Sequence, residues 1–251
     1  MKSWFIKKCP DWLFVPISNT YYVLSSALSS KEKVKITKVN DKWLVQKGEI
    51  KLLSPTPKFL GFGLHVFENK CERFFKIENG DTVLDVGACI GDTTIPMAIK
   101  TSTGKVIAVE PHPTNLEYLK LNLKEFRDVE IIGKAVWNEK GTIRFNVHNT
   151  PTGHSIISHK ERSSYIEVQC DTLDNMFADR KIDFVKIDVQ GAEVQVLEGG
   201  ERFLENTRKL VVETHDQHDV KRRTFPAVIK ILKGSGYETR LSMGFIVHAW
   251  K

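Results

Sequence analysis

The chain has 251 residues, of which 41% are hydrophobic, and a formal net charge of +6. This length fits one large α/β domain, or one core domain with an extension. No apolar run approaches the ~18 residues of a membrane-spanning helix, and the first residues lack the apolar core and cleavage site of a signal peptide. The four cysteines are scattered without a C-x-x-C pair, which is typical of a reducing compartment and disfavours a zinc site. We therefore expect a cytoplasmic protein with no membrane partner.

Residues 1–79 differ in sequence pattern from the rest and are predicted to form an N-terminal cap of helices and strands. Aromatic side chains crowd its start, and we expect them to pack rather than to bind a ligand. The pattern predicts a short helix over 21–28, a connector or edge strand over 31–38, and a hairpin over 42–53 around Lys47-Gly48. A helix over 65–77 would lead into the core domain, residues 80–251. The cap could shape an acceptor pocket or a subunit contact, so a homo-oligomer is one expectation.

The core domain alternates apolar strands with helices. Strands are predicted over 82–85, 105–110, 129–132, 181–189 and 209–214, and helices over 92–100, 114–123, 173–178, 191–197 and 226–232. The chain closes with an antiparallel pair, 237–241 and 245–250. This alternation predicts an α/β fold with a doubly wound, mostly parallel sheet and helices on both faces.

Two helix starts and one insertion are predicted in more detail. Asp92, Thr93 or Thr94 can cap the first core helix. Thr114 with Glu117 is predicted to form a capping box for the second. Residues 135–170 are predicted as a β insertion after the third strand, in which 135–137 and 142–147 pair as a hairpin and 165–170 adds a strand.

The stretch 82–94, TVLDVGACIGDTT, organises the core domain. It reads as an apolar strand that reaches Asp85, followed by a glycine-containing turn and a helix. Gly87 and Gly91 allow a backbone to approach a ligand without a Cβ in the way, and the helix start would face that ligand. The spacing G-x-x-x-G differs from the G-x-G-x-x-G of dinucleotide folds. Asp85 would repel a pyrophosphate but suit a cationic or hydroxyl-bearing ligand, and S-adenosylmethionine (SAM) offers both kinds of group. A turn without a ligand is the alternative.

Four acids fall at the ends of predicted strands: Asp85, Glu110, Asp188 and Glu213. The carboxyl ends of parallel strands form the ligand-binding edge of a doubly wound sheet, at the switch in strand order. The first and fourth strands should be neighbours there. At the end of the second strand, Glu110 occupies a position from which an acid can bind both ribose hydroxyls.

Six segments resemble, in this order, the FkbM-like SAM-dependent methyltransferases across residues 80–215: DVGACIGDTT, AVEPHP, KAVWN, DTLD, KIDVQGAEVQVLEGG and VVETH. Gln190 stands where that family more commonly has Glu. The resemblance implies a seven-stranded class I methyltransferase fold, SAM as the cofactor, and O-methylation of a sugar or another hydroxylated small molecule. The cofactor-binding residues that it implies are Asp85, Gly87, Ala88, Gly91, Asp92, Thr93, Glu110, Pro111, His112, Ala135, Val136 and Asp188.

A general base or a metal should assist the transfer, because a sugar hydroxyl is a poor nucleophile at neutral pH. The candidates for the base, in order, are His215, Asp188, Glu213 and then His154 in the inserted segment. Glu213 and His215 alternate at a strand end and should point to the same side, where an acid could hold the His as a base. Glu193 is a further candidate, or else a first-turn residue favoured by the helix dipole. Asp188, Glu213 and His215 could instead hold a divalent cation, but the spacing does not demand it, and no metal is predicted.

Three alternatives remain at this point. An NAD-dependent oxidoreductase would need the absent G-x-G-x-x-G. A methyltransferase acting on RNA or protein would share the fold, but the segment 188–191 lacks the N-P-P-Y-like sequence of base methylation, and the basic run 221–223 is short. We therefore do not expect a nucleic-acid partner. A non-catalytic SAM-binding protein would tolerate loss of Asp188 and His215.

Overall fold

The computed structural model describes residues 10–11, 13–16, 18–19, 34–59, 63–147, 164–217 and 222–251. A seven-stranded sheet of order β14-β15-β11-β10-β4-β5-β6 forms its centre. Its strands are β4 (Thr82–Val86), β5 (Lys105–Val109), β6 (Val129–Ile132), β10 (Phe184–Ile187), β11 (Lys209–Glu213), β14 (Glu238–Ser242) and β15 (Ile246–Trp250). Within the described ranges, no helix is both long and apolar enough to cross a membrane.

The sheet is mostly parallel, as predicted. Strands β6, β5, β4, β10 and β11 run parallel to one another, and β15 joins β11 and β14 in antiparallel pairs. The first and fourth core strands, β4 and β10, are neighbours, which confirms the predicted switch point. In the closing hairpin the last strand, β15, pairs with β11, and β14 forms the edge of the sheet.

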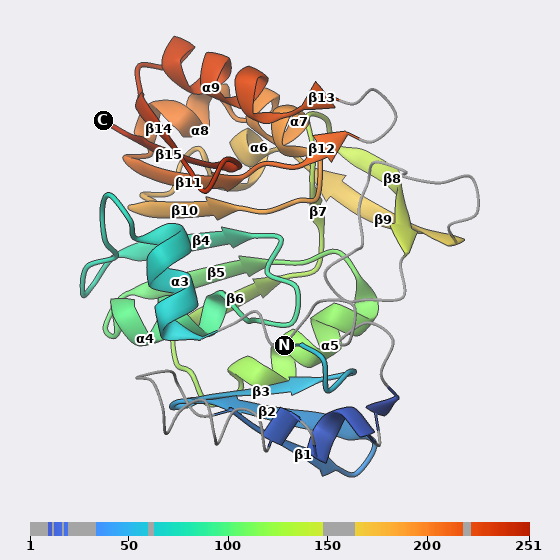
Figure 1. Ribbon diagram of the computed structural model, residues 1–251. Helices are drawn as coiled ribbons and strands as arrows, with labels where there is room; N and C mark the ends of the chain where they lie inside the picture. Colours follow the sequence, from blue (N-terminus) through green and yellow to red (C-terminus); the bar gives the residue numbers. More distant parts are fainter. Residues whose placement is uncertain are drawn as a thin grey trace.

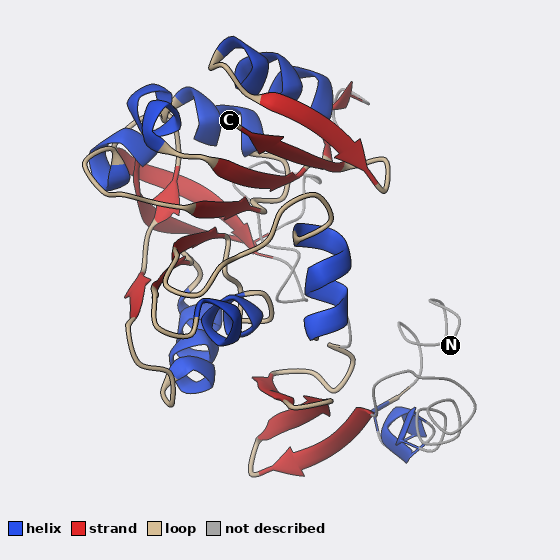
Figure 2. Cartoon of the chain, turned by 90° about the vertical axis from the view of Figure 1, so that its left-hand side faces the viewer, coloured by secondary structure: helices blue, strands red, loops and turns tan. Residues whose placement is uncertain are grey.

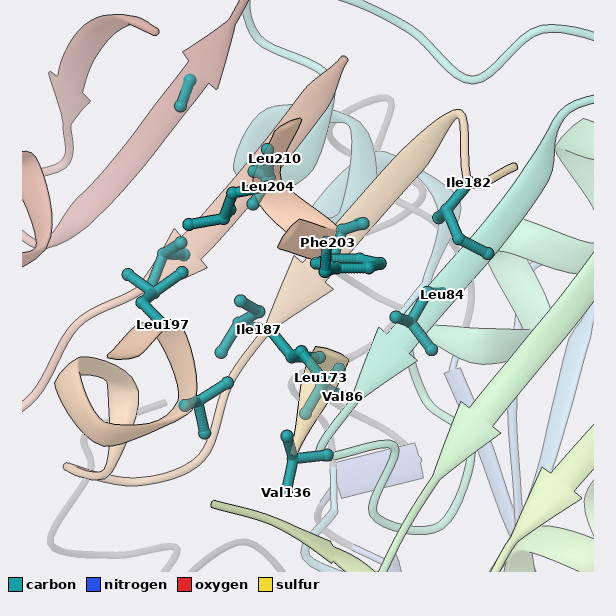
Figure 3. Packing of buried hydrophobic residues seen from close by; sticks show 14 of the residues in the cluster. Leu84, Val86, Val136, Leu173, Ile182, Ile187, Leu197, Phe203, Leu204 and Leu210 are labelled. Atoms are coloured by element: carbon teal, nitrogen blue, oxygen red, sulfur yellow. The ribbon is translucent and has the colours of Figure 1, made fainter. Parts of the chain in front are cut away.

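Helices cover both faces of the sheet (Figures 1 and 2). On one face lie α3 (Leu64–Cys71), α4 (Thr94–Thr101) and α5 (Pro113–Leu123), and on the other lie α6 (Leu173–Phe177), α7 (Glu193–Glu198), α8 (Glu201–Asn206) and α9 (Phe225–Gly234). Successive strand residues point to opposite faces, so Val83 packs with Phe67 of α3 while its neighbour Leu84 packs in the α6–α9 layer. Figure 3 shows this second core, where Leu84 and Ile187 lie near Phe203.

A separate three-stranded sheet packs outside α5 (Figure 1). Its strands are β1 (Val34–Val39), β2 (Lys42–Lys47) and β3 (Ile50–Ser54). The two strands predicted around Lys47-Gly48 are confirmed. Asn122 of α5 joins the layers, because its amide donates to the carbonyls of Leu53 (2.9 Å) and Ile90 (2.7 Å) and accepts from the Leu53 N–H (2.7 Å).

The approach to the core domain differs in one detail from the prediction. Helix α3 ends at Cys71 rather than near residue 77, because the Glu72 carboxylate accepts a hydrogen bond from the Ile77 N–H (2.9 Å) and turns the chain. Helix α3 packs on the main sheet, and the division at residue 79 stays a prediction. The helix predicted over 21–28 lies outside the described residues.

The β insertion is confirmed, but its predicted hairpin is wrong. The order of this sheet is β7 (Ala135–Val136), β9 (Ser164–Asp171), β8 (Gly141–Val147). Strand β9 lies between the other two, because it pairs along the whole of β8, from Gly141↔Cys170 to Val147↔Ser164, and leaves its other edge to the two-residue β7. Residues 148–163, which include the candidate His154, lie outside the described residues.

The predicted capping box is also wrong. Helix α5 begins at Pro113, whose ring suits a first helical position, and its N-cap is His112, whose Nδ1 accepts from the Asn115 N–H at 3.5 Å. Thr114 therefore lies inside the helix. Thr93 is the N-cap residue of α4, as one of the predicted options had it, but its hydroxyl makes no capping bond. That hydroxyl donates instead to Asp85.

Candidate functional site

A pocket with about 670 Å³ of empty space, partly open to solvent, lies at the carboxyl ends of β4, β5 and β10. This is the edge where doubly wound sheets bind ligands. Its lining consists of Val86, Gly87, Cys89, Asp92, Val109, Glu110, Pro111, Asn115, Lys134, Ala135, Val136, Phe145, Lys186, Asp188, Val189 and Gln190.

Part of the predicted cofactor set lines this pocket and part does not. Gly87, Asp92, Glu110, Pro111, Ala135, Val136 and Asp188 line it; Asp85, Ala88, Gly91, Thr93 and His112 are absent from its walls. His112 instead starts α5, and its ring centroid lies 6.4 Å from that of the pocket residue Phe145.

The glycine turn packs closely against other parts of the chain. Gly87 has a φ of 84°, and a Cβ there would lie 1.9 Å from the carbonyl oxygen of Asp188. At Gly91, with a φ of 97°, a Cβ would lie 3.2 Å from Leu119 of α5. Both positions require glycine because the chain passes closely here in a left-handed conformation. At Gly87 the near neighbour is the backbone just after β10, and at Gly91 it is a side chain of α5. Gly87 also lines the pocket, and the close approach of a ligand to this turn stays a prediction.

Glu110 follows β5 and is buried, with 4% of its surface exposed. Its two carboxylate oxygens accept hydrogen bonds from the Cys89 N–H (2.9 Å) and the His112 N–H (2.8 Å). Burial raises the pKa of Glu110 to about 7, although these hydrogen bonds act in the opposite direction. The site thus holds an acid whose charge is weakly compensated.

Lys186 is the central cation of the site. It lies in β10 directly opposite Asp85 of β4, and its Nζ is 3.4 Å from Asp85 Oδ1 and 3.5 Å from Asp188 Oδ2. Burial alone would lower the pKa of Lys186, but the nearby acids, Asp85 and Asp188 first, raise it well above its ordinary value. Burial raises the pKa of Asp92, a third nearby acid, to about 7. Two carboxylates therefore pair with one ammonium group, and a third acid, Asp92, adds to the charge around it.

The buried carboxylate of Asp85 is tied to the start of α4. Its Oδ2 accepts hydrogen bonds from the hydroxyls of Thr93 (2.8 Å) and Thr94 (2.7 Å). Asp85 therefore holds the glycine turn against the sheet.

His215 lies just beyond β11, between two carboxylates. Its Nδ1 is 2.8 Å from Glu193 Oε1, and its Nε2 is 3.7 Å from Asp188 Oδ1 and 2.9 Å from the Gln190 amide nitrogen. Burial alone would lower the pKa of His215, but the hydrogen bond to Glu193 and the charge of Asp188 raise it. A His in this setting can exchange a proton at Nε2.

Glu213 has a different partner. Both of its oxygens accept from Lys70 Nζ of α3, at 3.1 and 3.0 Å. Glu213 and His215 line a second pocket together with Thr214, Arg223, Met243, Gly244 and Phe245. Across the described ranges, no cluster of three His, Cys, Asp or Glu side chains is placed to hold a metal ion.

Several residues of the site have no role in the prediction from sequence, among them Lys186, Asn115 and Phe145. A signal exists for Lys186, since a lysine inside the apolar strand FVKI needs a carboxylate on a neighbouring strand. Asn115 donates to the carboxylate of Glu110 at 3.4 Å, and Phe145 comes from the insertion. Their places depend on tertiary packing.

The chain matches the methyltransferase FkbM domain over residues 85–239, which is more than half of its length. It is 23% identical over 210 residues to the methyltransferase sdnD of Sordaria araneosa, covering 69% of this chain and 80% of that protein.

Solved structures with a similar chain path include the following two, both with TM-scores below 0.5. One is the precorrin-6y C5,15-methyltransferase of Geobacter metallireducens GS-15, with 16% identity, a TM-score of 0.47, and coverage of 75% of this chain and 87% of that chain. Another is TYW2 of M. jannaschii in complex with AdoMet, with 15% identity, a TM-score of 0.48, and coverage of 87% and 92%. At these scores the likeness says nothing about the substrate. By the domain match, the chain belongs to the FkbM methyltransferase family and is a SAM-dependent methyltransferase.

Proposed function

We propose that this protein transfers the methyl group of SAM to a hydroxyl group of a small molecule, such as a sugar, with His215 as the general base. The observation that carries this proposal is the geometry of His215. Its Nδ1 contacts the Glu193 carboxylate, and its Nε2 lies beside Asp188 and Gln190, two residues of the pocket wall. A base beside the cofactor pocket is what hydroxyl methylation requires.

The pocket residues fit SAM. The buried acid Glu110, with a pKa of about 7, would bind the ribose hydroxyls. The apolar surfaces of Val109, Ala135 and Phe145 would contact the adenine. Asp85, Asp92 and Asp188 all lie near the ammonium of Lys186, and this local excess of acids suits a sulfonium or ammonium group.

The predicted cofactor residues outside the pocket wall would act through the backbone. We propose that Asp85, through Thr93, holds the glycine turn in place. Ala88 and Gly91 would keep that turn packed between the sheet and α5, and His112 would set the start of α5 beside Glu110.

When bound, SAM supplies an electrophilic methyl carbon whose bond to sulfur breaks with its electron pair. His215 Nε2 would receive the proton of the acceptor hydroxyl while an electron pair of the acceptor oxygen forms the new bond to carbon. The Gln190 amide donates to both Nε2 and Asp188 Oδ1, at 2.9 and 2.8 Å. The acceptor hydroxyl would replace this amide as the donor to Nε2. Asp188, whose pKa is held low by Lys186 and His215 against the effect of burial, would stabilise the imidazolium.

The proposal can be tested by measuring methyl transfer from isotopically labelled SAM. The acceptors are methyl glucoside, catechol, the matching amines, RNA and a protein mixture. We expect a methylated hydroxyl compound, and a loss of about 100-fold or more in rate for His215→Asn, with SAM affinity by calorimetry within about twofold of wild type. Transfer only to an amine or to a macromolecule would contradict the proposal, as would an unchanged rate in His215→Asn.

A further inference from the structure

We infer that Glu193 and Thr224 form a clamp that fixes the tautomer and orientation of His215, and that both are positioning residues for the transfer. The consequence for catalysis rests on the proposed function, in which His215 is the base. The clamp itself rests on contacts among residues of α7, α9 and the end of β11. The clamp is defined here as the Glu193 carboxylate together with the Thr224 hydroxyl and backbone N–H.

The Glu193 carboxylate is fully buried and used by three donors. Its Oε1 accepts from the Gly191 N–H (2.8 Å) and from Nδ1 of His215 (2.8 Å), and its Oε2 accepts from the Thr224 hydroxyl (2.9 Å). Glu193 is the first residue of α7, where a role toward the helix dipole was an alternative. The contacts instead direct its side chain to His215.

This arrangement selects one tautomer of His215. A carboxylate oxygen can only accept a hydrogen bond, so Nδ1 carries the proton and the neutral imidazole keeps its lone pair on Nε2. That nitrogen is the one beside Gln190 and Asp188. The clamp therefore turns the proton-accepting atom of His215 toward the wall of the cofactor pocket.

Thr224 holds the backbone of the same residue. Its hydroxyl accepts from the His215 N–H (3.1 Å), and its own N–H donates to the His215 carbonyl (3.1 Å). Thr224 is the N-cap of α9, yet its side chain makes no capping hydrogen bond. A threonine at this position could cap its own helix, but the Thr224 hydroxyl instead forms hydrogen bonds with His215 and Glu193.

If Glu193 and Thr224 did not act on His215, its neutral imidazole could adopt either tautomer. Among the described residues, three acids act on the charge of His215: Asp188 after β10, Glu193 in α7 and Glu213 in β11. The cationic Arg223 lines the same pocket as His215. Of the three acids, Glu193 contacts Nδ1, Asp188 lies nearest to Nε2, and Glu213 is paired with Lys70. A change at Glu193, or at Thr224 which donates to its carboxylate, should therefore alter the state of Nδ1 directly.

Nitrogen NMR of ¹⁵N-imidazole-labelled full-length protein, without SAM, tests the clamp directly. In wild type we expect the Nδ1–H tautomer of neutral His215 and a pKa above the ordinary value for histidine. In Glu193→Gln the protonated fraction of His215 at neutral pH should fall about tenfold, because a charge-assisted hydrogen bond is lost. Thr224→Val should shift neutral His215 away from the Nδ1–H tautomer. Thr224→Ser, which keeps the hydroxyl, should resemble wild type.

The matched control is Thr207→Val. Thr207 is also a buried threonine, but its hydroxyl donates to the Phe203 carbonyl (3.0 Å) after α8, so His215 should be unaffected. If Glu193→Gln fails to fold, Thr224→Val against Thr224→Ser decides. Unchanged His215 signals in a folded Glu193→Gln or Thr224→Val protein would overturn the clamp.

The outcomes separate the clamp from the proposed function. If the signals change as expected while His215→Asn still transfers methyl groups at the wild-type rate, the clamp stands and the base assignment fails. If His215→Asn is inactive but the signals of the clamp variants do not change, the base stands and the clamp fails.

Discussion

Replacing Lys186 by Met should destabilise the folded protein by about 3–5 kcal/mol, the usual cost of removing one partner of a buried ion pair. Only 3% of Lys186 is exposed, and its Nζ lies 3.4 Å from Asp85 Oδ1 and 3.5 Å from Asp188 Oδ2. Met has a similar length and an adaptable apolar side chain. The substitution therefore removes the charge while filling most of the volume, and it leaves the fully buried Asp85 without its cation.

Urea unfolding followed by tryptophan fluorescence and circular dichroism measures this loss. For a chain of 251 residues, it corresponds to a fall in melting temperature of about 6–20 °C. Arg202→Met is the control, because Arg202 pairs with Asp179 on the surface, where the two side chains are 64% and 95% exposed. That change should alter the unfolding free energy by at most about 1 kcal/mol.

A second variant separates loss of charge from loss of packing. Asp85→Asn combined with Lys186→Met removes both charges of the β4–β10 pair and should recover at least half of the stability that Lys186→Met loses, because no unpaired carboxylate remains at Asp85. A loss below about 1 kcal/mol in Lys186→Met would refute the reasoning, and so would a double variant less stable than the single one.

Three further predictions concern the same pocket. Gly87→Ala should lower both the melting temperature and SAM affinity, because the new Cβ would lie 1.9 Å from the Asp188 carbonyl; Gly141→Ala, with nothing within 4 Å of its Cβ, should change neither. Glu110→Gln should weaken SAM binding about 10–100-fold in calorimetric titrations if Glu110 binds the ribose, and wild-type affinity would contradict that role. Burial raises the pKa of Glu110 and Asp92 to about 7. Below that pH the folded protein therefore binds protons that the unfolded chain has released. Stability of the free protein should therefore fall as the pH rises from about 4 to 7, with a shallower slope in Glu110→Gln; equal slopes would argue against the shift at Glu110.

Local pattern was enough to determine the core architecture. The apolar runs ending in Asp85, Glu110, Asp188 and Glu213 predicted parallel strands whose acids meet near one edge, and the structure has β4, β5, β10 and β11 there. Strand alternation and turn residues act over a few neighbouring positions, so they are readable without a structure. The order of the short motifs also indicated the family that the domain match shows.

Tertiary structure alone decided which side chains meet. Sequence alternation suggested Glu213 as the acid beside His215, but Glu213 is bound by Lys70, and His215 contacts Glu193 of α7. Likewise, β9 lies between β7 and β8 because its long register with β8 outweighs a nearby hairpin. These contacts join segments that are far apart in the chain, and their partners are set by how the strand ends and helices pack. No local periodicity carries that information, so the clamp on His215 becomes visible only when α7, α9 and β11 come together.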